Sequence, residues 1–255
     1  IYDNMKAAEP KQTFTIGITD DVTNLSLPAG NHVDTTPAGT TSCKFWGLGS
    51  DGTVGANKDS IKIIGDNTDM YAQGYFFYDS KKSGGITVSH LRFGVNPITS
   101  SYLINKANFV ACHCPSYVTK YDMVQDLVPG GTFLLNCIWR PEELDKELPA
   151  SMKRYIANND INFYIINGIK IAEEVGLRGR ASTILQSAFF TISGILPVDQ
   201  AIELMKAKAT AKFSKKGDAV VAANHQGILR LKFPKAGKQQ RTRLLKKKSK
   251  QIAPK

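Results

Sequence analysis

The chain has few cysteines and no long apolar run, and each shortage excludes a class of protein. Its 255 residues include four cysteines, too few and too irregularly spaced for a disulfide framework. Cys112 and Cys114 flank His113, but no second ligand pair completes a zinc site, and no C-x-x-C-x-x-C run indicates an iron–sulfur cluster. No apolar run approaches a bilayer-spanning length, and no secretory leader is recognised. We therefore expect reduced, buried thiols, no metal site and no membrane segment.

Acidic residues are missing from the C-terminal end. From Leu229 to Lys255 there are 11 Lys and Arg and no Asp or Glu, so the rest of the chain holds 33 − 11 = 22 basic residues against 22 acidic ones. The net charge of +11 therefore belongs to residues 229–255, which we interpret as a disordered or non-native tail. Such a tail binds polyanions weakly and without sequence preference, so no specific nucleic-acid binding is expected. The start at Ile1, without a methionine, suggests a piece of a longer protein or a processed product.

Apolar runs alternate with helical patterns along most of the chain. Strands are expected at residues 13–18, 42–46, 74–78, 86–93, 109–113, 132–138 and 162–166. Helices are expected at residues 55–65, 97–105, 121–127, 141–158, 181–193, 198–208 and 217–228. Several strands are continuously apolar, which suits a sheet that is covered on both faces. The pattern predicts a three-layer α/β/α sandwich with a mostly parallel or mixed central sheet.

A glycine-rich loop lies between an expected strand and an expected helix. Residues 47–58 read GLGSDGTVGANK, and Gly47, Gly49 and Gly52 have the spacing of a dinucleotide-binding loop. In this context glycines let backbone N–H groups approach a phosphate at a helix N-terminus. Asn57 and Lys58 add a donor and a positive charge. Glycines also serve ordinary turns, so the loop alone does not decide between the two roles.

The next expected strand ends in a charged turn. Asp79 is followed by Ser80, Lys81, Lys82 and Ser83. In nicotinamide-binding domains an acid at this place binds the ribose hydroxyls, whereas a cation receives an additional phosphate. Together with the glycine loop, the turn favours an adenosine with a ribose phosphate, as in NADP or coenzyme A. A lysine-rich surface turn remains the alternative.

Several motifs in one order resemble a known family. GSDGTVGANK at residues 49–58, YDSKKSGG at 78–85, SHLRFG at 89–94, FVACH at 109–113 and ILQSAFF at 184–190 are similar to the gamma domain of pyruvate:ferredoxin (flavodoxin) oxidoreductases, members of the 2-oxoacid:ferredoxin oxidoreductases. The resemblance covers roughly residues 13–227. Residues 1–228 are accordingly expected to form one gamma domain.

The resemblance implies a role in a larger enzyme. The complete oxidoreductase decarboxylates pyruvate with thiamine diphosphate and Mg, sends electrons through [4Fe-4S] clusters to ferredoxin or flavodoxin, and passes the acetyl group to coenzyme A. The gamma domain would dock coenzyme A, while other domains or subunits hold the remaining cofactors. A homo-oligomer in the cytoplasm, or in the hydrogenosome or cytosol of an anaerobic eukaryote, is implied.

The same resemblance implies candidate ligand contacts but no catalytic residue. The pyrophosphate would be held by Gly49, Asp51, Gly52, Asn57 and Lys58, and the ribose phosphate by Lys81, Lys82 and Ser83. Arg92 is either a further ligand contact or a structural residue. Because no base–nucleophile pair is evident, we expect the isolated chain to be catalytically incomplete.

The sequence departs from the family pattern at two positions, and two other functions are compatible with it. Arg178 stands where the family is expected to carry Gly, and Ser182 where it is expected to carry Asn. An arginine would be strained if that backbone position is left-handed. A free-standing NAD(P)-dependent oxidoreductase would use the same loop but needs catalytic residues that are not apparent. A non-catalytic module, acting as a scaffold or bound to polyanions through its tail, is the third hypothesis.

Overall fold

The computed structural model describes residues 1–28, 34–81 and 84–230, in two units, Ile1–Thr36 and Pro37–Lys255. The described residues of the first unit form one short helix, α1 (Tyr2–Met5), and none of them is buried. The strand expected at residues 13–18 is wrong, because only Thr15 pairs, through a single bridge to Ser26. The chain turns at Asp20, whose carboxylate accepts the N–H of Val22 and Thr23. Among the described residues, the segment that returns makes backbone–backbone hydrogen bonds only to Thr15, through the Leu25 carbonyl and the Leu27 N–H.

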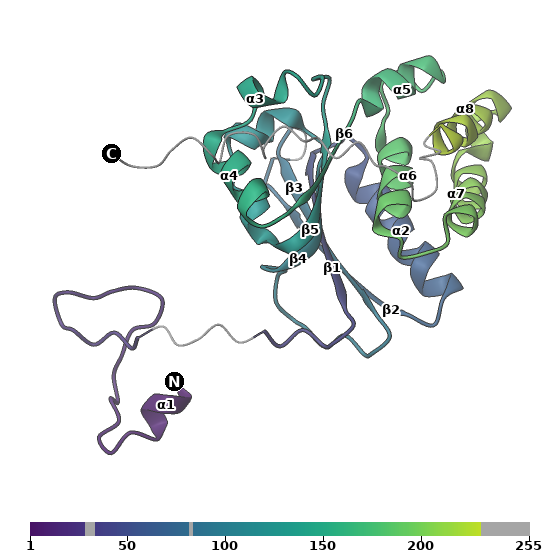
Figure 1. Ribbon diagram of the computed structural model, residues 1–255. Coiled ribbons are helices and arrows are strands. Elements are labelled where there is room, and N and C mark those ends of the chain that lie inside the picture. The colour runs from purple at the N-terminus through teal and green to yellow at the C-terminus, as the bar shows by residue number, and fades with distance from the viewer. Residues whose placement is uncertain (29–33, 82–83, 231–255) are drawn as a thin grey trace. The chain divides into compact units, whose positions relative to one another are not determined.

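The second unit is built on a six-stranded mixed sheet (Figure 1). The strands, in the spatial order β2-β3-β1-β4-β5-β6, are β1 (Thr41–Leu48), β2 (Tyr71–Tyr78), β3 (Ile86–Gly94), β4 (Ala107–Cys112), β5 (Leu127–Asn136) and β6 (Asn162–Ile166). Only β3 runs opposite to the other five, because it pairs antiparallel with both β1 and β2. The carboxyl ends of β1, β2, β4, β5 and β6 therefore meet at one edge of the sheet.

Helices cover both faces of the sheet, as Figure 1 shows. One face carries α2 (Thr53–Asn67), α5 (Gly168–Glu174), α6 (Ser182–Ser193), α7 (Val198–Phe213) and α8 (Asp218–Leu229). The other carries α3 (Leu144–Glu147), α4 (Ala150–Asn158) and the 3-10 helices η1 (Pro115–Thr119) and η2 (Val124–Asp126). A third 3-10 helix, η3 (Ser214–Lys216), lies between α7 and α8 in the chain. The predicted three-layer α/β/α sandwich is confirmed.

Alternate residues of the central strands enter different cores. On β4, Phe109 and Ala111 pack in the core beneath α2 and α6, whereas Val110 and Cys112 pack in the core beneath α4. All four side chains are at most 2% exposed. Because successive side chains point to opposite faces, a strand between two helical layers must be apolar at every position. This explains the continuous apolar runs in the sequence.

Three helix predictions differ from the structure. Residues 97–105 form no helix, since their backbone is hydrogen-bonded to side chains of the sheet: His90 Nδ1 accepts the Ile104 N–H, and Arg92 donates to the Tyr102 carbonyl. Residues 121–127 contain only the short η2. The helix expected at 141–158 is divided into α3 and α4 at Pro149, which lacks the N–H that a continuous helix needs.

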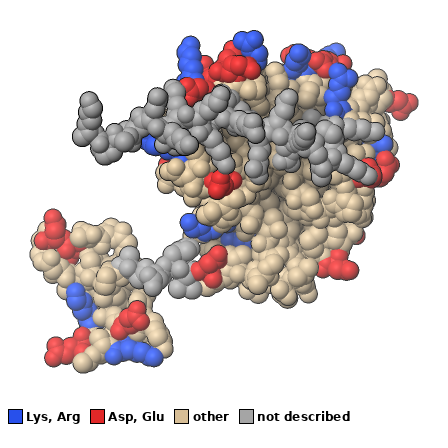
Figure 2. All heavy atoms as spheres, viewed as in Figure 1, with Lys and Arg blue, Asp and Glu red and all other residues tan. Residues whose placement is uncertain are grey.

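Charges of both signs are mixed on the described surface. In the face shown in Figure 2, Lys and Arg side chains lie among Asp and Glu side chains, with no field of one sign. Arg230–Glu174 and Arg140–Glu143 are two of the ion pairs. No helix among the described residues is both long and apolar enough to cross a membrane.

Candidate functional site

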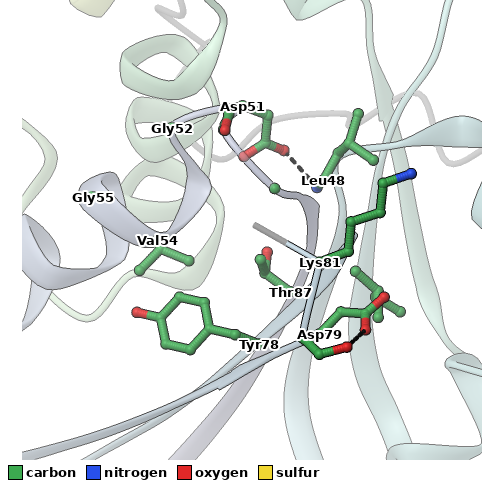
Figure 3. Close-up of a pocket in the computed structure, with 13 residues that line it drawn as sticks. Leu48, Asp51, Gly52, Val54, Gly55, Tyr78, Asp79, Lys81 and Thr87 are labelled. Atoms are coloured by element: carbon green, nitrogen blue, oxygen red, sulfur yellow. Dashed lines mark hydrogen bonds between the residues drawn. The ribbon is translucent and has the colours of Figure 1, made fainter. Parts of the chain in front are cut away.

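A pocket opens at the carboxyl end of β1, where the glycine-rich loop leads into α2 (Figure 3). It encloses about 530 Å³ and is lined by the loop, the first turn of α2, the end of β2 and the start of β3. The lining residues are Leu48, Gly49, Ser50, Asp51, Gly52, Val54, Gly55, Tyr78, Asp79, Ser80, Lys81, Ile86 and Thr87. This volume is in the range of small-molecule sites. In open α/β sheets, ligands bind at this edge, outside the carboxyl ends of parallel strands.

The side chain of Asp51 shapes the loop from within. Its Oδ2 accepts the Leu48 N–H at 2.9 Å and its Oδ1 accepts the Thr53 N–H at 2.7 Å, so the carboxylate spans the turn between β1 and α2. Ser50 and Gly52 both have a left-handed backbone, with φ values of +78° and +90°. Glycine adopts this conformation with little steric strain, because it has no Cβ. Packing also favours glycine at position 52, because a Cβ there would lie 2.8 Å from the Ser182 hydroxyl.

The first turn of α2 presents free donors to the pocket. Among the described residues, the N–H groups of Val54 and Gly55 have no hydrogen-bond acceptor, whereas the Ala56 N–H already bonds to the Gly52 carbonyl. Unpaired N–H groups and the helix dipole make such a terminus attractive to anions. Lys212 of α7 adds positive charge nearby: its Nζ is 3.7 Å from where a Gly55 Cβ would be, and it pairs with Asp59 at 2.6 Å.

The opposite wall comes from the turn between β2 and β3. Figure 3 shows Val54 and Gly55 on one side of the pocket and Lys81 on the other, with Tyr78 and Asp79 below. The Gly49 N–H donates to the Gly85 carbonyl at 2.7 Å, which holds the glycine loop against this turn. Tyr78 is 52% exposed, so its ring is available to a ligand.

The structure brings together some of the sequence-predicted site residues and separates others. Gly49, Asp51, Gly52 and Lys81 line the pocket, whereas Lys82 and Ser83 lie outside the described residues. Asn57 is 3% exposed and belongs to the buried side of α2. Lys58 is exposed, and its Nζ lies 5.2 Å from the centre of the Phe76 ring. On α2, the helical period places Asn57 on the buried side with Thr53 and places Lys58 on the exposed side. Neither Asn57 nor Lys58 therefore lines the pocket.

Arg92 does not reach the pocket. It lies six residues along β3 from Ile86, which lines the pocket, and is 3% exposed. At about 3.3 Å per residue, this places it roughly 20 Å from that end of the strand. Its guanidinium donates to Gln73 Oε1 at 2.9 Å and to the Tyr102 carbonyl at 2.8 Å. This placement favours the structural alternative for Arg92.

Sequence reasoning missed a buried hydrogen-bonded group beneath the loop. The Thr53 hydroxyl lies 2.7 Å from His113 Nδ1 and 2.8 Å from Asp51 Oδ2. Burial lowers the pKa of His113 to about 4, against a smaller opposing effect of Asp51. Thr53 and His113 are 60 positions apart, so only strand order brings them together. Within the described ranges, no three His, Cys, Asp or Glu residues gather as metal ligands would.

Solved structures share this architecture. A subunit of pyruvate oxidoreductase from Thermotoga maritima superposes with a TM-score of 0.59 at 17% identity, over 75% of this chain and 94% of that one. The 2-oxoglutarate:ferredoxin oxidoreductase of Magnetococcus marinus superposes with a TM-score of 0.54 at 14% identity, over 76% of this chain and 30% of that one. This chain thus has the α/β fold of these two proteins.

Sequence comparison identifies the family. The model for "Pyruvate ferredoxin/flavodoxin oxidoreductase" matches residues 42–230, and the chain belongs to that family. The pyruvate:ferredoxin oxidoreductase of Moorella thermoacetica is 57% identical over 228 residues, which are 89% of this chain and 20% of the relative. The chain therefore spans about a fifth of the length of the curated relatives that it matches first. The family resemblance inferred from the sequence is confirmed.

Proposed function

We propose that this chain docks coenzyme A within a pyruvate:ferredoxin or pyruvate:flavodoxin oxidoreductase. The observation that carries the proposal is the pair of unpaired N–H groups at Val54 and Gly55, two residues that line a pocket with Lys81 on its far side. A pyrophosphate suits the helix N-terminus, and the ribose phosphate of coenzyme A suits the lysine. The superposed 2-oxoglutarate:ferredoxin oxidoreductase was solved with coenzyme A and succinyl-CoA bound, which supports this class of ligand.

In this proposal the chain contributes proximity rather than acid–base chemistry. Holding the nucleotide end of coenzyme A keeps its thiol at a high effective concentration near an acyl group formed elsewhere in the enzyme. Thiamine diphosphate, Mg and the [4Fe-4S] clusters belong, in the same proposal, to the remaining four fifths of the enzyme, together with the contacts to ferredoxin or flavodoxin. The isolated chain then binds coenzyme A without turning over pyruvate.

Isothermal titration of the chain with coenzyme A and with dephospho-coenzyme A tests the proposal. We expect coenzyme A to bind about three- to tenfold more tightly, since a lysine–phosphate contact at an open site contributes on the order of 1 kcal/mol. Lys81→Ala should remove this preference. Lys106→Ala, an exposed lysine just before the amino end of β4, is the matched control and should keep it.

Two results would contradict the proposal in different ways. If the folded chain binds neither form, it does not dock coenzyme A by itself. If both forms bind equally, the pocket is right but Lys81 does not read the ribose phosphate. Titration with NADPH addresses the NAD(P)-dependent alternative, which tight binding of NADPH with no binding of coenzyme A would favour.

A further inference from the structure

Three side chains form a hydrogen-bonded line beneath the pocket. His113 follows the carboxyl end of β4, Thr53 is the first residue of α2, and Asp51 lies in the glycine-rich loop. His113 Nδ1 is 2.7 Å from the Thr53 hydroxyl, which is 2.8 Å from Asp51 Oδ2. Thr53 and His113 are 1% and 8% exposed, so water does not compete for the bond between them, whereas Asp51 is exposed.

The direction of each hydrogen bond follows from the number of protons available. An aspartate carboxylate only accepts, and Asp51 already accepts the N–H groups of Leu48 and Thr53. The Thr53 hydroxyl has one hydrogen, which it donates to Asp51, so it accepts from His113. Nδ1 of His113 therefore carries the ring proton and Nε2 carries the lone pair. Nε2 is buried and has no hydrogen-bond partner among the described residues.

The backbone around His113 ties this line to the rest of the sheet edge. The His113 N–H donates to the Trp46 carbonyl at 2.8 Å, and the His113 carbonyl accepts from Asn136 Nδ2 at 3.0 Å. Asn136 Oδ1 in turn accepts the Gly168 N–H at 2.9 Å. The carboxyl-terminal parts of β1 and β5 and the segments that follow β4 and β6 are thus joined by consecutive hydrogen bonds. These hydrogen bonds fix the backbone of His113 in the sheet. Its Nδ1–H can therefore define the position of the Thr53 hydroxyl and, through it, of the loop.

We propose that His113 is a positioning residue for the anion-binding loop, acting through Thr53 and Asp51. Its Nδ1–H orients the Thr53 hydroxyl, which holds the Asp51 carboxylate where it can accept the Leu48 and Thr53 N–H groups. That geometry sets the turn between β1 and α2 and directs the Val54 and Gly55 N–H groups at the phosphate ester. The inference rests on the proposed docking of coenzyme A for its ligand, but not for the hydrogen-bond line itself.

Substitutions that retain or remove one donor atom test the proposal. In His113→Asn the amide nitrogen stands where Nδ1 stands, whereas in His113→Gln it reaches toward the position of Nε2. We expect His113→Asn to keep coenzyme A affinity within about threefold and His113→Gln to lose about tenfold, as for a buried hydrogen bond. Thr53→Ser keeps the hydroxyl and should bind coenzyme A as tightly as His113→Asn does. Thr53→Val removes the hydroxyl and should lose as much coenzyme A affinity as His113→Gln. This second pair serves if a His113 variant does not fold.

A spectroscopic readout separates positioning from general stability. Nitrogen-15 NMR of the unliganded full chain should show His113, assigned by its loss in His113→Asn, as the neutral tautomer with a proton on Nδ1. The Leu48 and Thr53 amide resonances should shift in Thr53→Val and not in Thr53→Ser. An Nε2–H tautomer, or equal losses of affinity in both members of each pair of variants, would overturn the proposal.

The two proposals fail in distinguishable ways. If the wild-type chain shows the Nδ1–H tautomer and the amide shifts but binds no coenzyme A, docking fails and the hydrogen-bond line stands. If coenzyme A binds and the tautomer is Nε2–H, docking stands and the role of His113 fails.

Discussion

At the scale of single residues, Gly47 is required by its neighbour rather than by its own backbone. It is buried at the end of β1, and a Cβ there would lie 2.7 Å from the Cβ and Oγ1 of Thr53. Real Cβ atoms do not approach this closely, so either the strand or the start of α2 must move. The glycine that suggested a phosphate contact in the sequence therefore provides space for the Thr53–His113 hydrogen bond.

Replacing Gly47 with alanine should destabilise the chain. Overpacking of this kind costs about 1–3 kcal/mol, and urea unfolding monitored by circular dichroism would measure the loss. Gly65→Ala is the control, because its Cβ would meet Ala72 at an ordinary 3.7 Å inside α2. That change should raise the free energy of unfolding by about 0.5–1 kcal/mol through helix propensity. An unchanged stability of Gly47→Ala would contradict the packing account.

Two buried histidines should make the stability depend on pH. Burial lowers the pKa of His113 to about 4, and burial together with the charges of Lys44 and Arg92 lowers that of His90 to about 4. In the unfolded chain both titrate near 6.5, so between pH 6.5 and 4 the unfolded state binds more protons. Their contribution to stability is complete above pH 6.5 and is lost as the pH falls toward 4, by up to about 1.4 kcal/mol per unit for each histidine.

Urea unfolding at pH 7.5 and pH 5 would measure this loss. His90→Asn retains an acceptor for the Ile104 N–H, and His113→Asn retains a donor for Thr53, but neither side chain titrates. Each variant should therefore lose less stability than the wild type between the two pH values. If both variants keep the wild-type pH dependence, the histidines do not cause it.

At the scale of secondary structure, the sequence predicted all six strands of the sheet and the helices α2, α6, α7 and α8. The predictions for β1, β2, β3, β4, β6, α2, α6 and α8 agree with the structure to within a few residues, whereas β5 begins five residues earlier than predicted, at Leu127, and α7 continues to Phe213. The helix expected at 97–105 failed because its carbonyls and N–H groups bind side chains from β2 and β3, which no local pattern reveals. The short α5 was missed, although Asn167 caps it by accepting the Lys170 N–H.

The edge strand β2 has an unusual composition for its position. It reads YAQGYFFY, without a charged residue, and Tyr71, Tyr75 and Phe77 are 49%, 55% and 45% exposed. Edge strands of soluble proteins usually carry charges that prevent pairing with another sheet. Phe77→Lys should therefore reduce aggregation of the isolated chain, as measured by light scattering at increasing concentration. Phe76 lies on the face of β2 that packs against the core, so Phe76→Lys should instead destabilise the chain. Equal scattering by Phe77→Lys and the wild type would refute the prediction.

At the scale of the whole molecule, the order of several motifs was enough to identify the family. The residues that line the pocket could be predicted only in part. Of the predicted contacts, Gly49, Asp51, Gly52 and Lys81 line it, because the loop and the turn after β2 converge at one sheet edge. Tyr78 could not be selected from the sequence, since its place beside the loop depends on the pairing of β2 with β3 and of β3 with β1. The left-handed backbone suspected at Arg178 is present, with a φ of +49°.

The two units should differ in their contribution to stability. The described residues of Ile1–Thr36 include none that is buried, and both apolar cores consist of residues of Pro37–Lys255. A chain that starts at Pro37 should therefore keep its free energy of unfolding within about 1 kcal/mol, because it loses almost no buried apolar surface. A chain that ends at Gly217 removes α8, with Ile228 at 1% exposure, and should be clearly less stable in the same urea titration. Equal losses in both truncations would show that the first unit also carries stability.

The burial of Cys43 and Cys112 makes their thiols natural reporters of opening. Burial raises the pKa of both thiols well above the ordinary range, so neither ionises while the sheet is closed. Alkylating reagents attack thiolates, and they reach these sulfurs only when the central strands separate. The rate at which iodoacetamide labels the two side chains therefore records how often the middle of the sheet comes apart, without any probe having to be introduced.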